Sequence, residues 1–441
     1  MTLLPAIKIL LSLLVPCFLG YLLLIKVLRA RPSALLASAA AYPIGISAIT
    51  GALFLLGWAR APLFHVFIAT ILIAGYCVLT GLPRGEGPQQ PSPRLTPGQF
   101  LILALILSFA SFAFWQAAYF PVYAYDTLVV EAFKAKVFFY DQNFDKLPGI
   151  IHPSFPLQIP LIMTWANLCV AHWSERVPQL QFPMLFISLI CLHLYILRHL
   201  AGKTWGLVGA LALCASPLLM VHAAIPYRDL WMLYINSAAT GFLLLWMKDG
   251  KKSSMLVLAA IFAGIGTSIK LEGVAYMLAF ICTYIHVTRG SPTKTPALSL
   301  AKTLTILGLL TVPFILFKLS RGIPFNEKAV VDLSMNKLLY MPAAARKFLH
   351  EMFLSGNWSI IWTASVMAVI MEWKNAKQSP EIKMLAGTLG LYLAAHLLTV
   401  LLTNNAHDLL HEFTLSRLFM HFYFIPLWIT VLLLKNKYFR T

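Results

Sequence analysis

Residues 99–160 read QFLILALILSFASFAFWQAAYFPVYAYDTLVVEAFKAKVFFYDQNFDKLPGIIHPSFPLQIP, and they decide the class of fold. The first part, 99–119, has no charged residue and as a helix is long enough to cross a hydrocarbon core of about 30 Å. The second part, 123–160, gathers acids, lysines, aromatic residues and a His-Pro step, although only 11% of the chain is charged. We therefore expect a membrane helix followed by a polar region that carries the chemistry of the protein.

Similar apolar runs recur from one end of the chain to the other. The 441 residues are 59% hydrophobic and have a mean hydropathy of +0.78, which is typical of a polytopic membrane protein. The period-two alternation of an outer-membrane barrel is absent from the sequence, so the spans are predicted to be helices. The fold class that we predict is all-α, a polytopic integral membrane protein with about 13 transmembrane helices and extracytoplasmic juxtamembrane helices. The predicted spans lie near 5–25, 34–57, 63–82, 99–119, 180–197, 205–222, 230–247, 254–269, 273–288, 299–318, 352–371, 384–403 and 415–434.

The chain is predicted to have two parts. Residues 1–98 hold additional N-terminal transmembrane helices and a cytoplasmic linker rich in Pro and Gly, and 99–441 form a transmembrane catalytic module with a large outer loop, 120–179. The six cysteines lie in apolar stretches without zinc or disulfide spacing, so we interpret them as packing residues. A cationic cluster follows the first apolar run instead of preceding it, which is unlike a secretory signal and favours an N-terminus outside the cytoplasm.

The distribution of charge indicates the topology. If the first loop is cytoplasmic, the inner segments are 26–33, 83–98, 198–204, 248–253, 289–302, 372–383 and 435–441. They hold 19 of the 34 Lys and Arg residues but only 4 of the 16 acids. Cytoplasmic loops are enriched in Lys and Arg, so the net charge of +18 is a topological signal and argues against binding of nucleic acid. The same topology requires 156–172 to be a re-entrant or surface-lying segment that does not change sides.

On this topology most acids face the extracytoplasmic side, and two of them, Asp126 and Glu131, stand near the start of the predicted outer loop. Asp126 follows the span 99–119, where it is either the N-cap of a helix running to about Tyr140 or a general base at the membrane boundary. Glu131 and Lys134 are three residues apart and suit an ion pair on a solvated helix face. His152-Pro153, followed by Pro156 and Pro160, interrupts helix continuity, and the His alone indicates no function.

Further charged pairs are predicted at the outer ends of apolar helices. They are Arg228 with Asp229, Lys270 with Glu272, and Arg417 with His421 one helical turn later. Ionisable groups at such depth are costly unless they are paired locally or functional. Because several helices bring them to one side, we expect them to form a site, and Arg and Lys suit a phosphate group.

The order of these motifs resembles membrane glycosyltransferases of the C-type fold (GT-C), including the protein mannosyltransferase and aminoarabinose transferase superfamily. Asp126 matches the position of the catalytic aspartate in the first outer loop. The run EAFKAKVFF followed by HPSFPLQIP is similar to the Lys-Ala-Lys and His-Pro-x-x-Pro-Leu pattern. Asp229 resembles the second outer acidic motif, TSIKLEG the Lys-x-Glu-Gly motif, and SRLFMHFYFIP the Arg-Leu-x-x-His helix. The likeness spans roughly 99–434.

The resemblance implies an integral membrane glycosyltransferase that moves a sugar from a polyprenyl phosphate to an acceptor hydroxyl on the extracytoplasmic face. Asp126 is then the catalytic base, and the implied substrate-binding residues are Lys134, Lys136, His152, Arg228, Asp229, Lys270, Glu272, Arg417 and His421. The expected partners are the lipid-linked donor, a glycan, lipid or protein acceptor, and membrane lipids. No cofactor is required, no metal ligands are assigned, and a divalent metal, which some relatives use, stays open. The implied location is a cell membrane, in bacteria the inner membrane.

Three other functions stay open on the sequence. A transporter or lipid flippase would place charged helix ends along a translocation path, although the sequence shows no clear repeated half. A glycan polymerase or ligase would use a diphosphate-linked donor. A non-catalytic membrane subunit would use the outer loops to bind a partner. The sequence contains no P-loop, HExxH or GxSxG motif, which argues against a nucleotide-driven transporter, a zinc protease or a serine hydrolase.

Overall fold

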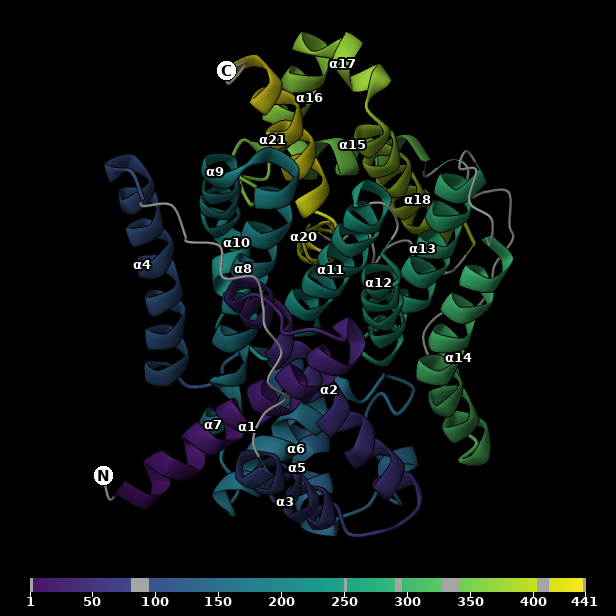
Figure 1. The fold of residues 1–441 in the computed structure, drawn as a ribbon. Coiled ribbons are helices and arrows are strands. Elements are labelled where there is room, and N and C mark those ends of the chain that lie inside the picture. The colour runs from purple at the N-terminus through teal and green to yellow at the C-terminus, as the bar shows by residue number, and fades with distance from the viewer. Residues whose placement is uncertain are drawn as a thin grey trace. The chain divides into compact units, whose positions relative to one another are not determined.

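The computed structural model describes residues 3–80, 95–249, 252–289, 296–326, 339, 341–402 and 412–438. Every regular element within these ranges is a helix, which confirms the predicted all-α class (Figure 1). The helices are α1 (Leu3–Leu28), α2 (Ala34–Trp58), α3 (Phe64–Thr80), α4 (Pro97–Tyr119), η1 (Asp126–Ala132), α5 (Phe133–Asp141), η2 (Leu147–Gly149), α6 (Gln158–Val170), α7 (Arg176–Gln179), α8 (Gln181–Ala201), α9 (Lys203–Cys214), α10 (Pro217–His222), α11 (Arg228–Lys248), α12 (Ser253–Ile265), η3 (Gly266–Ser268), α13 (Glu272–Arg289), α14 (Pro296–Ser320), α15 (Met341–Phe353), α16 (Ile361–Met371), α17 (Trp373–Gln378), α18 (Pro380–Leu402), α20 (Glu412–Met420) and α21 (Phe424–Tyr438).

Within the described ranges, seven helices are long and apolar enough to cross a membrane, or eight if the bent pair Thr414–Met420 and Phe424–Lys435 counts as one span. The sequence predicted about 13, and the difference arises where a predicted span is short or interrupted. The predicted span 205–222 is divided between α9 and α10, where Pro217 lacks the N–H that would continue the first helix. The predicted span 352–371 is likewise divided between the end of α15 and α16.

The chain folds as two compact units. Unit 1 comprises 1–195, 221–228 and 315–323, and unit 2 comprises 196–220, 229–314 and 324–441. The helices α1, α2 and α3 belong to the same unit as η1, α5 and α6. The additional N-terminal helices that the sequence predicted therefore share a core with the predicted outer loop.

The first two helices of unit 1 pack backbone against backbone (purple in Figure 1). A Cβ atom added to Gly20 would lie 1.7 Å from the carbonyl oxygen of Ala41, and one added to Gly45 would lie 1.8 Å from that of Pro16. Only glycine permits this approach, as in the small-residue contacts of membrane helices. The α1–α2 pair therefore forms a close-packed wall of unit 1.

Helix α6 occupies the interior of unit 1. All of its 13 residues are buried, and it packs against α1, α2, α3 and α5. Its polar side chains find partners there: Gln158 accepts a hydrogen bond from Thr50 at 2.9 Å, and the indole of Trp165 donates to the carbonyl of Ser12 at 3.0 Å. A 13-residue helix is too short to span a bilayer, so α6 agrees with the prediction that this segment does not change sides.

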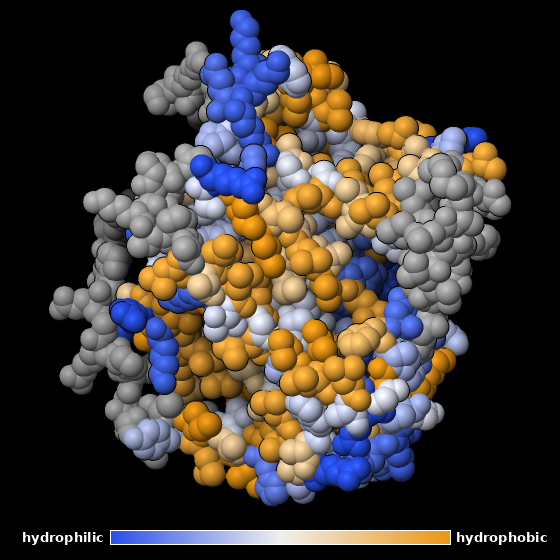
Figure 2. Space-filling model, turned by 90° about the vertical axis from the view of Figure 1, so that its right-hand side faces the viewer, coloured by the Kyte–Doolittle hydropathy of each residue, from blue (hydrophilic) through white to orange (hydrophobic). Residues whose placement is uncertain are grey.

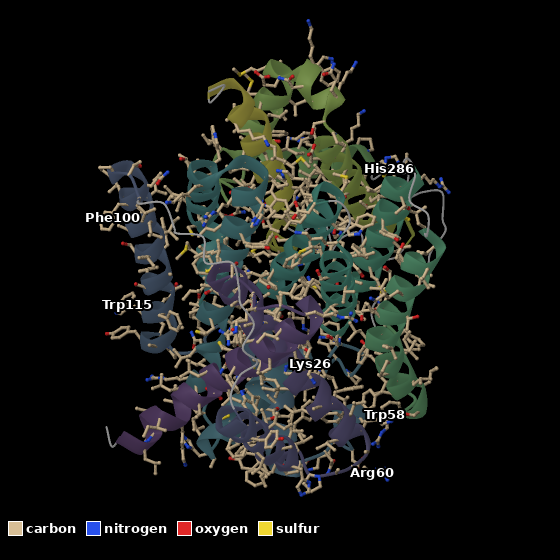
Figure 3. All side chains as sticks on the ribbon, viewed as in Figure 1. Lys26, Trp58, Arg60, Phe100, Trp115 and His286 are labelled. Atoms are coloured by element: carbon tan, nitrogen blue, oxygen red, sulfur yellow. The ribbon has the colours of Figure 1, made fainter. Side chains whose placement is uncertain are left out.

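Apolar side chains remain on the outside of the molecule, as a protein surrounded by lipid requires. Phe100 and Trp115 project outward from α4, and their exposed fractions are 65% and 51% (Figure 3). Figure 2 shows hydrophobic residues over much of the face that it draws. Together with the seven long apolar helices, this surface identifies an integral membrane protein.

Unit 2 is built around α11, which is almost completely enclosed. The chain makes a second close approach there: a Cβ atom on Gly273 would lie 2.1 Å from the carbonyl oxygen of Gly266. This contact holds the start of α13 against η3 and places Lys270 in the short connection between them. The last two helices, α20 and α21, meet at a bend of 45° at residues 421–423. At this bend the carbonyl of His421 accepts a hydrogen bond from Asn236 of α11.

Candidate active site

A buried carboxylate with three basic partners lies at the start of α11. Asp229 is fully buried, and its Oδ1 lies 3.0 Å from Lys270 Nζ and 2.9 Å from His421 Nε2. Its Oδ2 accepts a hydrogen bond from Arg417 Nε at 2.8 Å. The partners come from the η3–α13 connection, from α20 and from the α20–α21 bend, so separate segments converge on one acid. We call these four residues the Asp229 cluster.

A second acid extends the Asp229 cluster. Glu272, in the first turn of α13, lies 3.4 Å from Lys270 Nζ, which is a weaker contact than that to Asp229. The negative charges of Asp229 and Glu272 therefore balance the positive charges of Lys270 and Arg417 when His421 is neutral. The sequence allowed local pairs within each motif, and the structure shows that Lys270 also bridges to a distant helix.

Two residues that the sequence did not indicate continue the cluster into the interior. The Tyr276 hydroxyl lies 2.9 Å from His421 Nδ1 and 2.8 Å from His396 Nε2. Tyr276 follows Glu272 by one helical turn on α13, and His396 stands within the apolar helix α18. An ionisable His in an apolar span was the available signal, because such residues are rare in membrane helices.

Unit 1 holds a second buried ion pair, which we call the Glu131 cluster. Glu131, in η1, contacts Arg228 at the start of α11, and both side chains are buried. The Arg228 guanidinium also lies over the ring of Phe155, 4.5 Å from its centroid. The sequence suggested that Glu131 pairs with Lys134 and that Arg228 pairs with Asp229. The structure instead gives each acid a partner from another element.

Lys134 and His152 complete the Glu131 cluster. Lys134 is completely buried, donates to the backbone carbonyl of His152 at 2.5 Å and lies 5.5 Å from the centroid of Phe155. The His152 ring stacks on the same aromatic ring, with centroids 4.7 Å apart and an interplanar angle of 16°. His152 adopts a φ of 53°, a left-handed conformation that is uncommon for a residue other than glycine. The His-Pro step therefore turns the chain sharply around Phe155.

Burial dominates the electrostatics of Glu131. It raises the pKa of this carboxyl above its ordinary value, and Arg228 and Lys134 oppose that shift. The nearby charge of Asp126 raises the pKa further. Glu131 Oε2 has no hydrogen-bond partner among the described residues. This acid is therefore less well satisfied than Asp229.

Asp126 is the first residue of η1, a seven-residue π-helix that continues into α5. The N-cap position belongs to Tyr125, which makes no side-chain cap, so the alternative interpretation of Asp126 as an N-cap is wrong. The Asp126 side chain is half-buried. Single π-helical turns are rare and occur often at functional sites. Lys136, ten residues further, is exposed and belongs to neither cluster.

The predicted site residues thus fall into two groups by unit. Lys134, His152 and Arg228 meet in unit 1 around Glu131, which the sequence did not assign to the site, whereas Asp229, Lys270, Glu272, Arg417 and His421 meet in unit 2. Arg228 and Asp229 are consecutive residues of α11, one in each unit. Across the described ranges, no group of three His, Cys, Asp or Glu side chains is arranged to hold a metal ion.

Comparison with known proteins gives the class of fold. No protein-family model matches the sequence, and no curated protein matches it. Among solved structures, the chain is similar to ArnT from Cupriavidus metallidurans in the apo state, with a TM-score of 0.53 and 14% identity over 78% of this chain and 61% of ArnT. It is similar in the same way to ArnT bound to undecaprenyl phosphate, with a TM-score of 0.52 and 14% identity over 77% and 60%.

The chain therefore spans about three fifths of the length of ArnT. At 14% identity the similarity establishes the fold. It confirms the resemblance to the C-type glycosyltransferase fold at that level. The donor, the acceptor and the roles of the site residues belong to the proposed function.

Proposed function

We propose that this chain is an integral-membrane glycosyltransferase that moves a sugar from a polyprenyl phosphate to the hydroxyl of an acceptor. The observation that carries the proposal is the Asp229 cluster, in which Lys270, Arg417 and His421 are gathered on one buried acid. Such a group of cationic donors suits an anionic headgroup, and it occurs here in a chain with the fold of ArnT.

Two features favour a polyprenyl-phosphate donor. One of the two similar ArnT structures contains undecaprenyl phosphate. In this chain, the Lys270 ammonium has three N–H groups, of which Asp229 and Glu272 engage two, and its side chain is 15% exposed. We propose that its remaining N–H group binds a phosphate oxygen.

The proposed reaction is a direct displacement. The acceptor hydroxyl attacks the anomeric carbon, Asp126 takes the hydroxyl proton, and the bond between that carbon and the phosphate oxygen breaks, which releases the polyprenyl phosphate. Lys270, Arg228 and Arg417 stabilise the charge that develops on the departing phosphate. This route needs no enzyme nucleophile and no cofactor. Lys134, Lys136, His152, Glu272 and His421 are proposed to contribute to substrate binding.

The proposed location is a cell membrane, the inner membrane in a bacterium, with the reaction on the extracytoplasmic side. The uneven distribution of Lys and Arg between inner and outer segments supports this orientation. Polyprenyl phosphates are lipids, so a donor with its tail among membrane helices is consistent with the apolar exterior of α4.

The experiment that tests the proposal is sugar transfer by the purified protein from a panel of polyprenyl-phosphate sugars. We expect transfer from at least one donor, and a fall of about 10²- to 10⁴-fold in its rate for Asp126→Asn. Asp145→Asn is the matched control, because Asp145 lies in the same predicted outer loop, is 44% exposed and belongs to neither cluster. Equal rates for Asp126→Asn and the control would remove Asp126 from the mechanism. A wild-type protein that carries lipid across vesicles without forming product would favour the flippase.

A further inference from the structure

A chain of three hydrogen bonds runs from Asp229 into the interior of unit 2. Asp229 Oδ1 meets His421 Nε2 at 2.9 Å, His421 Nδ1 meets the Tyr276 hydroxyl at 2.9 Å, and that hydroxyl meets His396 Nε2 at 2.8 Å. The four residues come from α11, the α20–α21 bend, α13 and α18, and each is at most 5% exposed. Chains of this kind, buried and complete, fix the orientation of their members.

The Asp229 carboxylate at one end decides which atom donates in each bond of the hydrogen-bond chain. An ionised carboxylate only accepts hydrogen bonds, so His421 Nε2 must carry a hydrogen. A neutral imidazole then has a lone pair on Nδ1, which accepts the hydrogen of the Tyr276 hydroxyl. The Tyr276 oxygen in turn accepts from His396 Nε2, which must be protonated. One arrangement of hydrogens satisfies all three bonds while His421 is neutral.

The surrounding charges favour the neutral form of His421. Lys270 and Arg417 already place two positive charges within 3.0 Å of Asp229, and a third cation in the same buried position would be repelled. Glu272 offsets part of this repulsion through its contact with Lys270. If His421 were an imidazolium, its Nδ1 would become a donor and the bond to Tyr276 would reverse, which would free the Tyr276 hydroxyl to donate to His396 Nε2.

Other contacts hold His421 and Tyr276 in place independently of this hydrogen-bond chain. The His421 carbonyl accepts a hydrogen bond from Asn236 Nδ2 at 3.1 Å, and its N–H donates to the carbonyl of Leu418. The Tyr276 ring packs edge-on against Tyr392, with centroids 4.7 Å apart. Loss of the Tyr276 hydroxyl alone would therefore remove two hydrogen bonds while the rings keep their packing.

We propose that Tyr276 and His396 are positioning residues that hold His421 as its Nε2–H tautomer and thereby fix the Asp229 carboxylate between Lys270 and Arg417. The consequence is that Oδ1 is shared by Lys270 and His421 while Oδ2 faces Arg417. The relevance of this arrangement to phosphate binding rests on the proposed function. The hydrogen-bond chain itself does not depend on it.

The test is the ¹⁵N spectrum of protein labelled on its histidine rings, in which His421 is identified by the signals that disappear in His421→Gln. We expect Nε2 of His421 to be protonated and Nδ1 to be unprotonated. In Tyr276→Phe the donor to Nδ1 is lost, so the Nδ1 signal shifts and the tautomer becomes mixed. His396→Gln keeps an N–H donor near the position of Nε2 and should retain the wild-type signature, whereas His396→Leu should move toward that of Tyr276→Phe.

Three results would overturn the inference: an imidazolium at His421, the opposite tautomer, or an unchanged signature in Tyr276→Phe. Binding of undecaprenyl phosphate is the second readout, and Tyr276→Phe should weaken it about 2- to 10-fold, the effect of losing the one hydrogen bond that orients His421. If the ring signatures follow the expectation and the wild-type protein binds no undecaprenyl phosphate, the positioning chain stands and the proposed function is wrong.

Discussion

Glu131 in unit 1 and Asp229 in unit 2 are both buried acids, but the protein holds them in different ways. Both oxygens of Asp229 are engaged, by Lys270 and His421 on one side and by Arg417 on the other. Glu131 contacts Arg228 through Oε1, and its Oε2 has no hydrogen-bond partner among the described residues. Asp229 is therefore a fixed structural anion, whereas Glu131 is a less well satisfied acid whose pKa is raised by burial.

The largest effect is expected where the comparison predicts a fixed anion. Asp229→Asn leaves Lys270 and Arg417 beside a neutral amide, and removal of one member of a buried ion pair typically costs about 3–5 kcal/mol. The measurement is the free energy of unfolding in detergent. Asp249→Asn, the same substitution at the opposite end of α11, is the control and should change this free energy little. Equal losses in the two variants would contradict the assignment of Asp229 as an anchor.

A smaller effect is expected at Glu131. Glu131→Gln should destabilise the protein by about 1–2 kcal/mol, because one of the two carboxylate oxygens has no hydrogen-bond partner to lose and the Arg228 guanidinium keeps its contact with Phe155. A loss of unfolding free energy as large as that of Asp229→Asn would contradict the difference between the two acids.

The pH dependence of stability is a second way to distinguish Glu131 from a fixed anion. Because burial raises the pKa of Glu131 in the folded protein, its contribution to stability is largest below the ordinary pKa of 4.5 and is lost as the pH rises through the raised value. The stability of wild type relative to Glu131→Gln should therefore fall over the pH range above the ordinary pKa of 4.5. A difference that is constant or rises over this range would show that Glu131 is fully ionised and satisfied.

Within the Glu131 cluster, the aromatic ring of Phe155 contacts Arg228. Its ring faces the Arg228 guanidinium at 4.5 Å, so Phe155→Leu should cost about 0.5–2 kcal/mol through loss of the cation–π contact, in addition to any change in packing. Phe155→Tyr keeps the face of the ring and is the matched control. If the two variants are equally stable, the aromatic face does not hold Arg228.

The smallest effect is expected at the exposed acid Asp145. It pairs with Arg321 at 2.8 Å and with Arg60 at 3.0 Å, and these contacts, the hydrogen bond from Arg321 first, lower its pKa. Its contribution is therefore present above the ordinary pKa of 3.8 and is lost as the pH falls below it, the opposite sign to Glu131. Unfolding of Asp145→Asn at about pH 3 and pH 6 checks this, because only at the higher pH should the variant be less stable than wild type.

The sequence predicted the membrane class well because hydrophobic length is a local property. The apolar runs 5–25, 34–57, 99–119 and 299–318 correspond to the long helices α1, α2, α4 and α14. Interruptions were harder to predict. The break before Pro217 and the bend at 421–423 arise inside stretches that are apolar enough on average to be predicted as single spans, and composition alone does not separate a bent helix from a straight one.

The partners of the charged residues were predicted less well than the residues themselves. Sequence neighbours suggested that Arg228 pairs with Asp229, yet Arg228 contacts Glu131, which lies 97 positions earlier. Such contacts are set by tertiary packing, which a single sequence does not reveal. Tyr276 escaped notice because a tyrosine in an apolar helix is usually a packing residue, and only its two histidine neighbours in space distinguish it.

The central claim, that the Asp229 cluster binds the phosphate of a lipid-linked sugar, is tested most directly by binding of undecaprenyl phosphate to the purified protein. We compare wild type with Lys270→Met and with Lys302→Met, which removes an exposed lysine of α14 outside both clusters. The account predicts a Kd for Lys270→Met that is raised about tenfold or more, as for loss of a hydrogen bond to a charged group, and an unchanged Kd for Lys302→Met. The same Kd for all three proteins, or no binding by wild type, would contradict it.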